Sequence, residues 1–96
     1  MEKIRFGIIG GGWRSRFYVT IARQMPERFG VTGVLLRDGE KAQAYAAQTG
    51  VKTFTSFDQF MAASPEFVVL SVHRSAAPEY LHLLMKMGVP VLCETP

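Results

Sequence analysis

A chain of 96 residues is long enough for one modest hydrophobic core and too short for two, because a domain of this size buries roughly 60 to 65% of the surface of its unfolded chain. Hydrophobic residues make up 48% and charged residues 20%, which excludes a disordered or fibrous protein. The net charge of +3 comes from basic residues spread along the chain; since a nucleic-acid surface needs them clustered, we expect no nucleic-acid partner.

The single cysteine and the short apolar runs limit the possible disulfides, metal sites and membrane segments. Cys93 has no partner for a disulfide within the chain, no cysteine metal site is possible, and the general tendency of cysteine to be buried predicts a buried strand residue. No apolar run approaches the roughly 18 to 20 residues of a membrane span, and none fits a signal peptide. We therefore expect a cytoplasmic protein with no membrane partner and no metal.

The first predicted elements surround a run of glycines. Residues 4–9 form a short apolar run bounded by glycine, which is typical of a buried strand. Gly10 to Gly12 follow. From Trp13 the apolar residues recur at helical spacing until Pro26, which predicts a helix over residues 13–25.

A second strand and two helices are expected in the middle of the chain. Residues 31–37 are rich in β-branched residues and leucine and predict a strand, and residues 39–48 are strong helix formers stopped by Gly50. A short third strand is expected at residues 51–54. Ser56 then caps a helix that continues to residue 63.

The last third of the chain completes an alternating pattern. Residues 67–72 predict a fully buried strand, residues 76–87 a helix, and residues 89–93 a fifth strand. Five strands alternating with four helices predict an α/β fold of the Rossmann type, a doubly wound parallel sheet with helices on both faces, because each parallel crossover needs a helix-length return. Residues 1–96 would then form a single domain.

The predicted fifth strand ends close to the last residue, Pro96. Its sheet neighbour would have to come from elsewhere. We therefore expect the chain to be the front part of a longer protein, with a second domain that is absent here.

The glycines have a spacing that suits a phosphate. Gly10, Gly12 and Ser15 form the pattern G-x-G-x-x-S between a predicted strand and a predicted helix. In dinucleotide-binding domains the first glycine allows a tight turn, the second lets the backbone approach the pyrophosphate, and the third position is small so that helix packs on strand. The helix N-terminus then favours the anion. These residues, with Gly11 between them, are candidate cofactor contacts.

Other interpretations of the glycine turn stay open. It could serve chain reversal alone, although three adjacent glycines cost backbone entropy if no ligand uses them. A methyltransferase-type glycine loop is a further alternative, but such loops usually carry an acidic residue where this chain has Ile8. A P-loop is not expected, because no G-x-x-x-x-G-K-[ST] pattern occurs.

Four stretches together resemble a known family: KIRFGIIGGGWRSRF, DGEKAQAYAAQTG, FTSFDQFMAASPEFVVLSV and MGVPVLCETP. They are similar to the N-terminal domain of the Gfo/Idh/MocA oxidoreductases, the family of glucose-fructose oxidoreductase and inositol dehydrogenase. The resemblance implies an NAD(P)-binding domain followed by a second domain that supplies substrate contacts and dimer surface, and so a homo-oligomer at full length.

The resemblance also exposes departures at the catalytic positions. The family carries a lysine in an E-K-P pattern that takes part in proton transfer, and this chain has Thr95 there. Threonine cannot act as an acid or base in the working range. The loop after the fourth strand usually reads T-P-x-x-x-H, and here His73 replaces the proline and Ala77 the histidine. His73 is the candidate for the missing proton-transfer group, with a cofactor contact or a plain loop residue as alternatives.

Two functions follow from these residues. The first is an NAD(P)-dependent oxidoreductase that passes hydride between nicotinamide and a sugar, cyclitol or related hydroxyl or carbonyl compound, inactive as this part alone. The alternative is a dinucleotide-binding sensor or partner-binding module without catalysis, which Thr95 keeps open.

Further cofactor contacts are expected around the turn. Trp13 could cover the dinucleotide and Arg14 could neutralise phosphate charge, as could Arg16, although exposed side chains at a helix start are the plainer interpretation. Ser71 is expected at the carboxyl end of the fourth strand. By the resemblance, Glu94 borders the nicotinamide.

The end of the second strand predicts which dinucleotide is bound. NAD-binding domains carry an acidic residue there for the ribose hydroxyls, and alignment puts Leu36 at that position. Arg37 follows and offers a charged fork suited to the extra phosphate of NADP. We therefore expect NADP rather than NAD, unless a shift in the turn brings the carboxylate of Asp38 to the ribose.

Overall fold

The computed structural model describes residues 3–94, which form a five-stranded sheet with four helices. The strands lie in the order β3-β2-β1-β4-β5, and every neighbouring pair is parallel. Their bounds are β1 Ile4–Ile9, β2 Phe29–Leu35, β3 Thr53–Phe54, β4 Phe67–Leu70 and β5 Val91–Cys93. The helices are α1 Trp13–Gln24, α2 Gly39–Thr49, α3 Phe57–Ala62 and α4 Ala77–Lys86. The predicted doubly wound α/β fold is confirmed.

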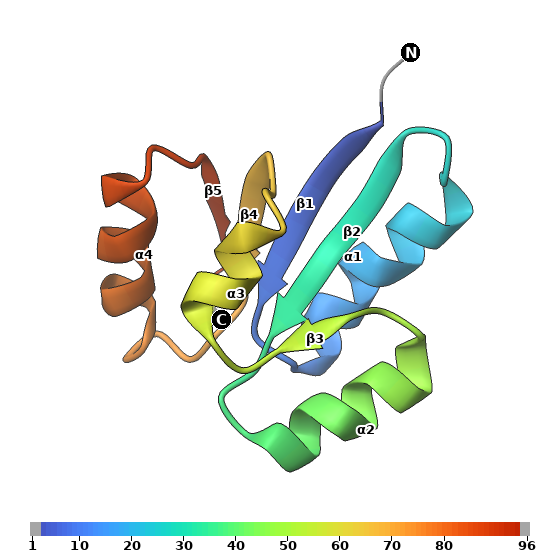
Figure 1. The fold of residues 1–96 in the computed structure, drawn as a ribbon, viewed down its shortest axis with the longest axis horizontal. Helices are drawn as coiled ribbons and strands as arrows, with labels where there is room; N and C mark the ends of the chain where they lie inside the picture. Colours follow the sequence, from blue (N-terminus) through green and yellow to red (C-terminus); the bar gives the residue numbers. More distant parts are fainter. Residues whose placement is uncertain (1–2, 95–96) are drawn as a thin grey trace.

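The two faces of the sheet carry separate apolar cores. One core joins α1 and α2 to the sheet through buried residues that include Val19 and Tyr45, and the other joins α3 and α4 through Phe60 and Leu84. Figure 1 shows α3 in front of the sheet and α1 behind it. This layering follows from the direction of the crossovers, because right-handed connections that run toward β3 and toward β5 must pass over opposite faces.

Local chemistry fixes where the helices begin and end. Pro26 follows shortly after α1, and Gly50 ends α2 with a left-handed backbone at φ 75°, as the sequence predicts. The Ser56 hydroxyl accepts a hydrogen bond from the Gln59 amide at 3.4 Å and caps α3. Helix limits therefore agree with the sequence to within one or two residues.

The strands agree less well. β2 begins and ends two residues earlier than residues 31–37, because the Phe29 amide bonds to the Met25 carbonyl directly after α1 and the chain is then already beside β1. β4 stops at Leu70, and Val72 lines a pocket instead of extending the strand. β5 starts only at Val91 because Val89 still bonds to the end of α4.

Cys93 is exposed, so the prediction that it is buried is wrong. It lies on β5, the edge strand of the sheet within residues 3–94, where no neighbouring strand covers its far side. The general tendency of cysteine to be buried holds for strands with neighbours on both sides and does not apply at this edge.

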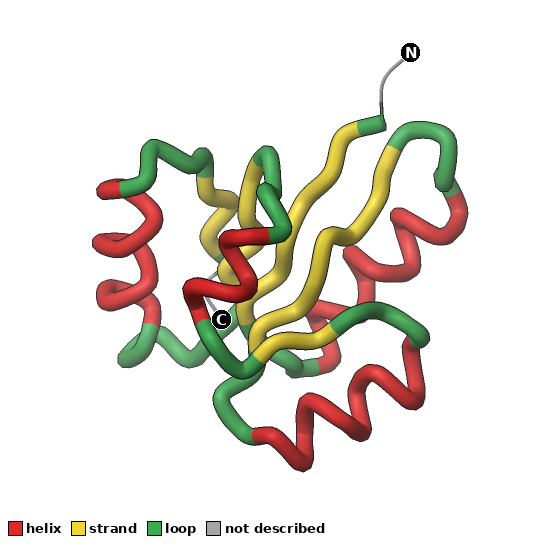
Figure 2. Tube along the Cα trace, viewed as in Figure 1, coloured by secondary structure: helices red, strands yellow, loops and turns green. Residues whose placement is uncertain are grey.

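The sheet has its topological switch point at the carboxyl end of β1. Beyond this end, the Gly10 amide donates to the Leu35 carbonyl of β2 at 3.0 Å, and the Ser71 amide after β4 donates to the Ile9 carbonyl of β1 at 2.8 Å. The chain leaves β1 and β4 toward helices on opposite faces of the sheet (Figure 2). In open α/β sheets such a divergence leaves a crevice at the switch point. Ligands of open α/β sheets bind in such a crevice.

Candidate functional site

A pocket of about 600 Å³ opens at the carboxyl ends of β1 and β2. Its walls come from the glycine turn, one side of α2 from Lys41 to Gln48, the loops after β2 and β4, and the first turn of α4. The lining residues are Ile9, Gly10, Gly11, Gly12, Arg16, Leu35, Leu36, Arg37, Asp38, Lys41, Ala44, Tyr45, Gln48, Val72, Ala76 and Tyr80.

The three glycines of the turn have different surroundings. Gly10 has φ 115°, and a Cβ there would lie 1.9 Å from the Ser71 carbonyl oxygen, so only glycine lets β1 turn beside β4. A Cβ on Gly11 would lie 2.2 Å from Leu36 Cδ2. A Cβ on Gly12 would meet nothing within 4 Å. The fold explains the first two glycines, and the space beside the third is open to a ligand.

Ser15 fills the small position of the motif. It is fully buried, and its hydroxyl donates to the Gly12 carbonyl at 2.6 Å and lies 3.0 Å from the Tyr45 hydroxyl. Burial of a hydroxyl is costly unless it is hydrogen-bonded, and both contacts meet that need. Serine thus replaces a smaller residue while keeping α1 close to β1 and linking the turn to α2.

Helix α1 begins at the pocket without a side-chain cap. Gly12 occupies its N-cap position, and within residues 3–94 no side chain bonds to its first amides there. The neighbouring helix differs, because Asp38 Oδ1 accepts from the amides of Glu40 at 2.9 Å and Lys41 at 3.3 Å. An uncapped N-terminus leaves amide donors and the positive end of the helix dipole facing the pocket.

Three cations line the pocket. Arg16 lies over the Tyr45 ring at 5.1 Å and bonds to Gln48, while Lys41 approaches from α2 and Arg37 from the loop after β2. Asp38 is the one carboxylate among the lining residues, and its oxygen is engaged in capping α2. The pocket is therefore suited to an anion.

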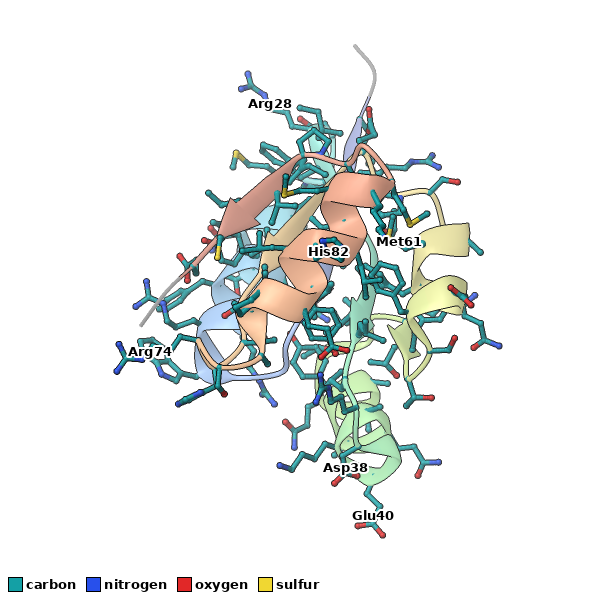
Figure 3. The ribbon with its side chains drawn as sticks, turned by 90° about the vertical axis from the view of Figure 1, so that its left-hand side faces the viewer. Arg28, Asp38, Glu40, Met61, Arg74 and His82 are labelled. Atoms are coloured by element: carbon teal, nitrogen blue, oxygen red, sulfur yellow. The ribbon has the colours of Figure 1, made fainter. Side chains whose placement is uncertain are left out.

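Arg37 reaches across the pocket to α4. Its Nε donates to the Tyr80 hydroxyl at 3.0 Å, its guanidinium lies 5.4 Å from the centre of the Tyr80 ring, and one Nη lies 3.3 Å from a Glu79 oxygen. These contacts join the loop after β2 to the first turn of α4. Figure 3 shows Asp38 and Glu40 at this end of the molecule and Arg28 at the opposite end.

Arg14 and Glu94 form a separate group beside the pocket. Arg14 Nε donates to a Glu94 oxygen at 2.8 Å, and the Tyr18 hydroxyl donates to the other at 2.6 Å. These hydrogen bonds, first from Arg14 and then from Tyr18, lower the pKa of Glu94. Desolvation, followed by the bond to Glu94, raises the pKa of Tyr18 to about 12. This group ties α1 to the end of β5.

The remaining predicted residues lie at the rim or away from the pocket. Trp13 is 68% exposed and packs edge-on against Phe17 with the ring centres 5.2 Å apart. His73 is exposed, and its Nδ1 is paired with the Ser75 hydroxyl at 2.8 Å. The Ser71 carbonyl lies directly against Gly10, and Thr95 lies outside the described residues.

The sequence did not indicate Lys41, Glu79 and Tyr80 as site residues. Lys41 lies in the first turn of α2, and Tyr80 lies one turn after Ala76 on the helix that follows β4. The first turns of both helices adjoin the carboxyl end of the sheet. Helical spacing applied to those turns, together with the switch-point rule, could have found these residues.

Neither a metal cluster nor a membrane-spanning helix occurs in the described part of the chain. Within residues 3–94, no three His, Cys, Asp or Glu side chains lie close enough together to hold a metal ion. Over the same residues, no helix is both long and apolar enough to cross a bilayer.

The sequence matches a known family model over nearly its whole length. Residues 4–96 match the GFO_IDH_MocA model, described as an oxidoreductase family with an NAD-binding Rossmann fold. An uncharacterized oxidoreductase of Streptococcus pneumoniae is 27% identical over 94 residues, which are 97% of this chain and 25% of that protein.

Solved structures share the fold. The WlbA dehydrogenase from Bordetella pertussis, in complex with NADH and UDP-GlcNAcA, superposes with a TM-score of 0.81 and 26% identity over 96% of this chain and 28% of its own. The UDP-N-acetylglucosamine 3-dehydrogenase GnnA from Acidithiobacillus ferrooxidans superposes with a TM-score of 0.82 and 27% identity over 100% of this chain and 30% of its own. This chain therefore spans about a quarter of the length of these relatives.

Proposed function

The chain belongs to the Gfo/Idh/MocA oxidoreductase family, as an NAD-binding domain, and from that premise we propose that it holds the dinucleotide of an enzyme that passes hydride between nicotinamide and a sugar, cyclitol or related hydroxyl or carbonyl compound. The dehydrogenases named above act on or bind nucleotide sugars by their descriptions, which supports this substrate class. Because the chain spans about a quarter of its relatives, we also propose that a second domain supplies the substrate contacts and a dimer surface.

The open space beside Gly12 carries the proposal. It lies in the pocket, at the start of an uncapped twelve-residue helix, and no protein atom lies where a Cβ would project. A pyrophosphate there would accept hydrogen bonds from the first amides of α1 and lie within the field of the helix dipole. Gly10 and Gly11 hold this turn in shape, and Ser15 holds the helix against it.

Replacing Gly12 tests the cradle directly. We expect Gly12→Val to remove detectable binding of NADH and NADPH in calorimetry, because the branched side chain would fill the space the pyrophosphate needs. Folding should survive, since Gly12 has an extended backbone (φ −70°, ψ 173°) that valine also adopts.

Gly39→Val is the matched control. Gly39 also lies at a helix start, and a Cβ on it would likewise meet nothing within 4 Å, but it does not line the pocket. We expect this variant to bind as the unmodified protein does. Equal cofactor affinity in both variants would contradict the cradle.

For the cofactor, we propose that the pocket prefers NADP. Leu36, at the end of β2, is buried against Gly11 and cannot accept from a ribose hydroxyl. The carboxylate of Asp38 is engaged by two amides of α2, and three cations line the pocket. The Bordetella relative was solved with NADH, which favours NAD instead. The ratio of the dissociation constants of this chain for NADPH and NADH decides between the two cofactors.

A dinucleotide-binding sensor without hydride transfer is the alternative function for the full-length protein. Thr95 cannot transfer a proton, and His73 is exposed and lies outside the pocket lining. We propose the enzyme rather than the sensor, with the proton-transfer group supplied by the second domain. Reduction of NAD or NADP by a panel of nucleotide sugars, measured at 340 nm on the full-length protein, supports the enzyme, and binding without reduction supports the sensor.

A further inference from the structure

The contact between Arg37 and α4 has a role that the glycine turn does not explain. Arg37 follows β2, and Glu79 and Tyr80 belong to the first turn of α4. Arg37 and Tyr80 line the pocket, and Glu79 is connected to it by its contact with Arg37. In a dinucleotide complex of this fold, the adenosine end lies beside the end of β2. The three residues therefore lie where an adenosine 2′-substituent would be read.

Tyr80 provides a fixed platform for the guanidinium. It is 8% exposed, belongs to the apolar core of α3 and α4, and lies near Phe57 with the ring centres 6.5 Å apart. Its hydroxyl accepts from Arg37 Nε at 3.0 Å, and its ring lies 5.4 Å from the guanidinium carbon. A buried ring with one bond to Nε fixes the plane of the fork while leaving the outer N–H groups for a ligand.

Glu79 holds Arg37 by a different and weaker contact. The closest nitrogen and oxygen are 3.3 Å apart, and the two side chains are 66% and 69% exposed. Exposed pairs of this kind contribute little and exchange partners readily. A phosphate dianion at Arg37 would displace the Glu79 carboxylate and would be repelled by it.

Among the charged groups around Arg37, Glu79 is the one that would oppose the binding of a phosphate. Lys41 lines the same pocket and would attract a phosphate, and the Asp38 carboxylate is engaged by the amides of Glu40 and Lys41. A carboxylate beside the adenosine ribose disfavours NADP. In this chain the carboxylate in contact with Arg37 belongs to α4 and not to the end of β2.

Resting on the proposed dinucleotide site, we propose that Glu79 and Tyr80 set how strongly the pocket distinguishes NADP from NAD. Tyr80 is a positioning residue that orients the Arg37 fork toward the 2′-phosphate. Glu79 competes with that phosphate for the same fork. The two neighbouring residues thus act on cofactor selectivity in opposite directions.

Calorimetry with NADPH and NADH tests both roles. We expect Glu79→Gln to tighten NADPH binding by about 3- to 10-fold and to leave NADH binding unchanged, because only the phosphate is repelled by the carboxylate. We expect Tyr80→Phe to weaken NADPH binding by about 3- to 10-fold, with NADH again unchanged, because the ring stays in the core and only the bond to Nε is lost. A general loss of structure would lower both affinities alike.

Glu40→Gln is the matched control, because it removes the same charge from an exposed position on helix α2, and within residues 3–94 the Glu40 carboxylate forms no salt bridge, whereas Glu79 contacts Arg37. We expect it to leave the NADPH to NADH ratio unchanged. An equal gain in Glu40→Gln and Glu79→Gln, or an unchanged ratio in Glu79→Gln and Tyr80→Phe, overturns this proposal while the dinucleotide site stands. Binding of neither cofactor by the unmodified protein instead contradicts the proposed function.

Discussion

Arg37 carries a permanent positive charge at the point where β2 ends and the pocket begins. Replacing Arg37 is the simplest test of the NADP preference. A charge-assisted phosphate contact contributes about 1.5 to 3 kcal/mol, so Arg37→Ala should weaken NADPH binding by roughly 10- to 150-fold and leave NADH binding nearly unchanged.

Arg28→Ala is the control for this change. It removes the same charge at the opposite end of the molecule (Figure 3) and should leave both affinities as they are. If the unmodified protein binds NADH more tightly than NADPH, the preference is NAD, and the ribose is read by another group such as the Asp38 carboxylate.

At the residue scale, the sequence was most informative about the glycine turn, where the backbone itself takes the required shape. The glycine spacing depends on local geometry, and Gly10, Gly11 and Gly12 line the pocket together. Long side chains are different, because their partners are set by tertiary packing. Arg14, expected at a phosphate, pairs with Glu94, and Tyr80 meets Arg37 only because α4 lies across the crevice.

At the scale of elements, the Glu94 group shows how a helix is tied to a strand that it does not follow. Arg14 and Tyr18 lie on α1 and Glu94 directly after β5, about eighty residues later. Because the pKa of Glu94 is lowered in the folded chain, its contribution to stability is present above its ordinary value of 4.5 and is lost as the pH falls through the lower, folded value.

A pH series of thermal unfolding checks this contribution. Glu94→Gln should lower the melting temperature at pH 7, and the difference from the unmodified protein should shrink as the pH falls below 4.5 and through the lower pKa of the folded state. Glu27→Gln, which changes an exposed carboxylate in the turn after α1, is the control. A difference that stays constant from pH 7 to pH 3 would rule out the ionised Glu94 as its source.

The Tyr18 phenol makes the stability of the folded chain depend on pH in the alkaline range as well. Its pKa is raised from 10.0 to about 12, so the unfolded chain loses this proton first. The stability that Tyr18 contributes is present below pH 10 and is lost as the pH rises toward 12. In Tyr18→Phe this part of the alkaline loss should be missing.

The sequence predicted helices more accurately than strands, for a physical reason. Helix limits depend on local signals such as Pro26, Gly50 and the Ser56 cap, and these were visible in the sequence. A strand ends where its neighbour ends, which no local pattern records. β4 therefore stops at Leu70 although the apolar run continues to Val72, because Val72 lies beyond the end of β1 and lines the pocket.

At the scale of the whole molecule, one exposed apolar stripe runs along α1. It consists of Trp13, Phe17 and Ile21, with Met25 directly after the helix, and the exposed fractions are 68%, 55%, 40% and 40%. Residues four apart share one face of a helix, so these side chains form a continuous surface. Continuous apolar surface of this kind favours association.

We therefore expect the 96-residue chain to self-associate as its concentration rises, in sedimentation velocity experiments at neutral pH. The double variant Phe17→Lys and Ile21→Lys should shift the population toward monomer, because it places charge in the middle of the stripe without touching the buried face of α1, which carries Val19 and Ala22. Met85→Lys is the control, since Met85 is 75% exposed but lies on α4. A chain that stays monomeric at every concentration would show that the stripe does not bind another copy, and equal dissociation in both variants would assign the effect to net charge instead of to α1.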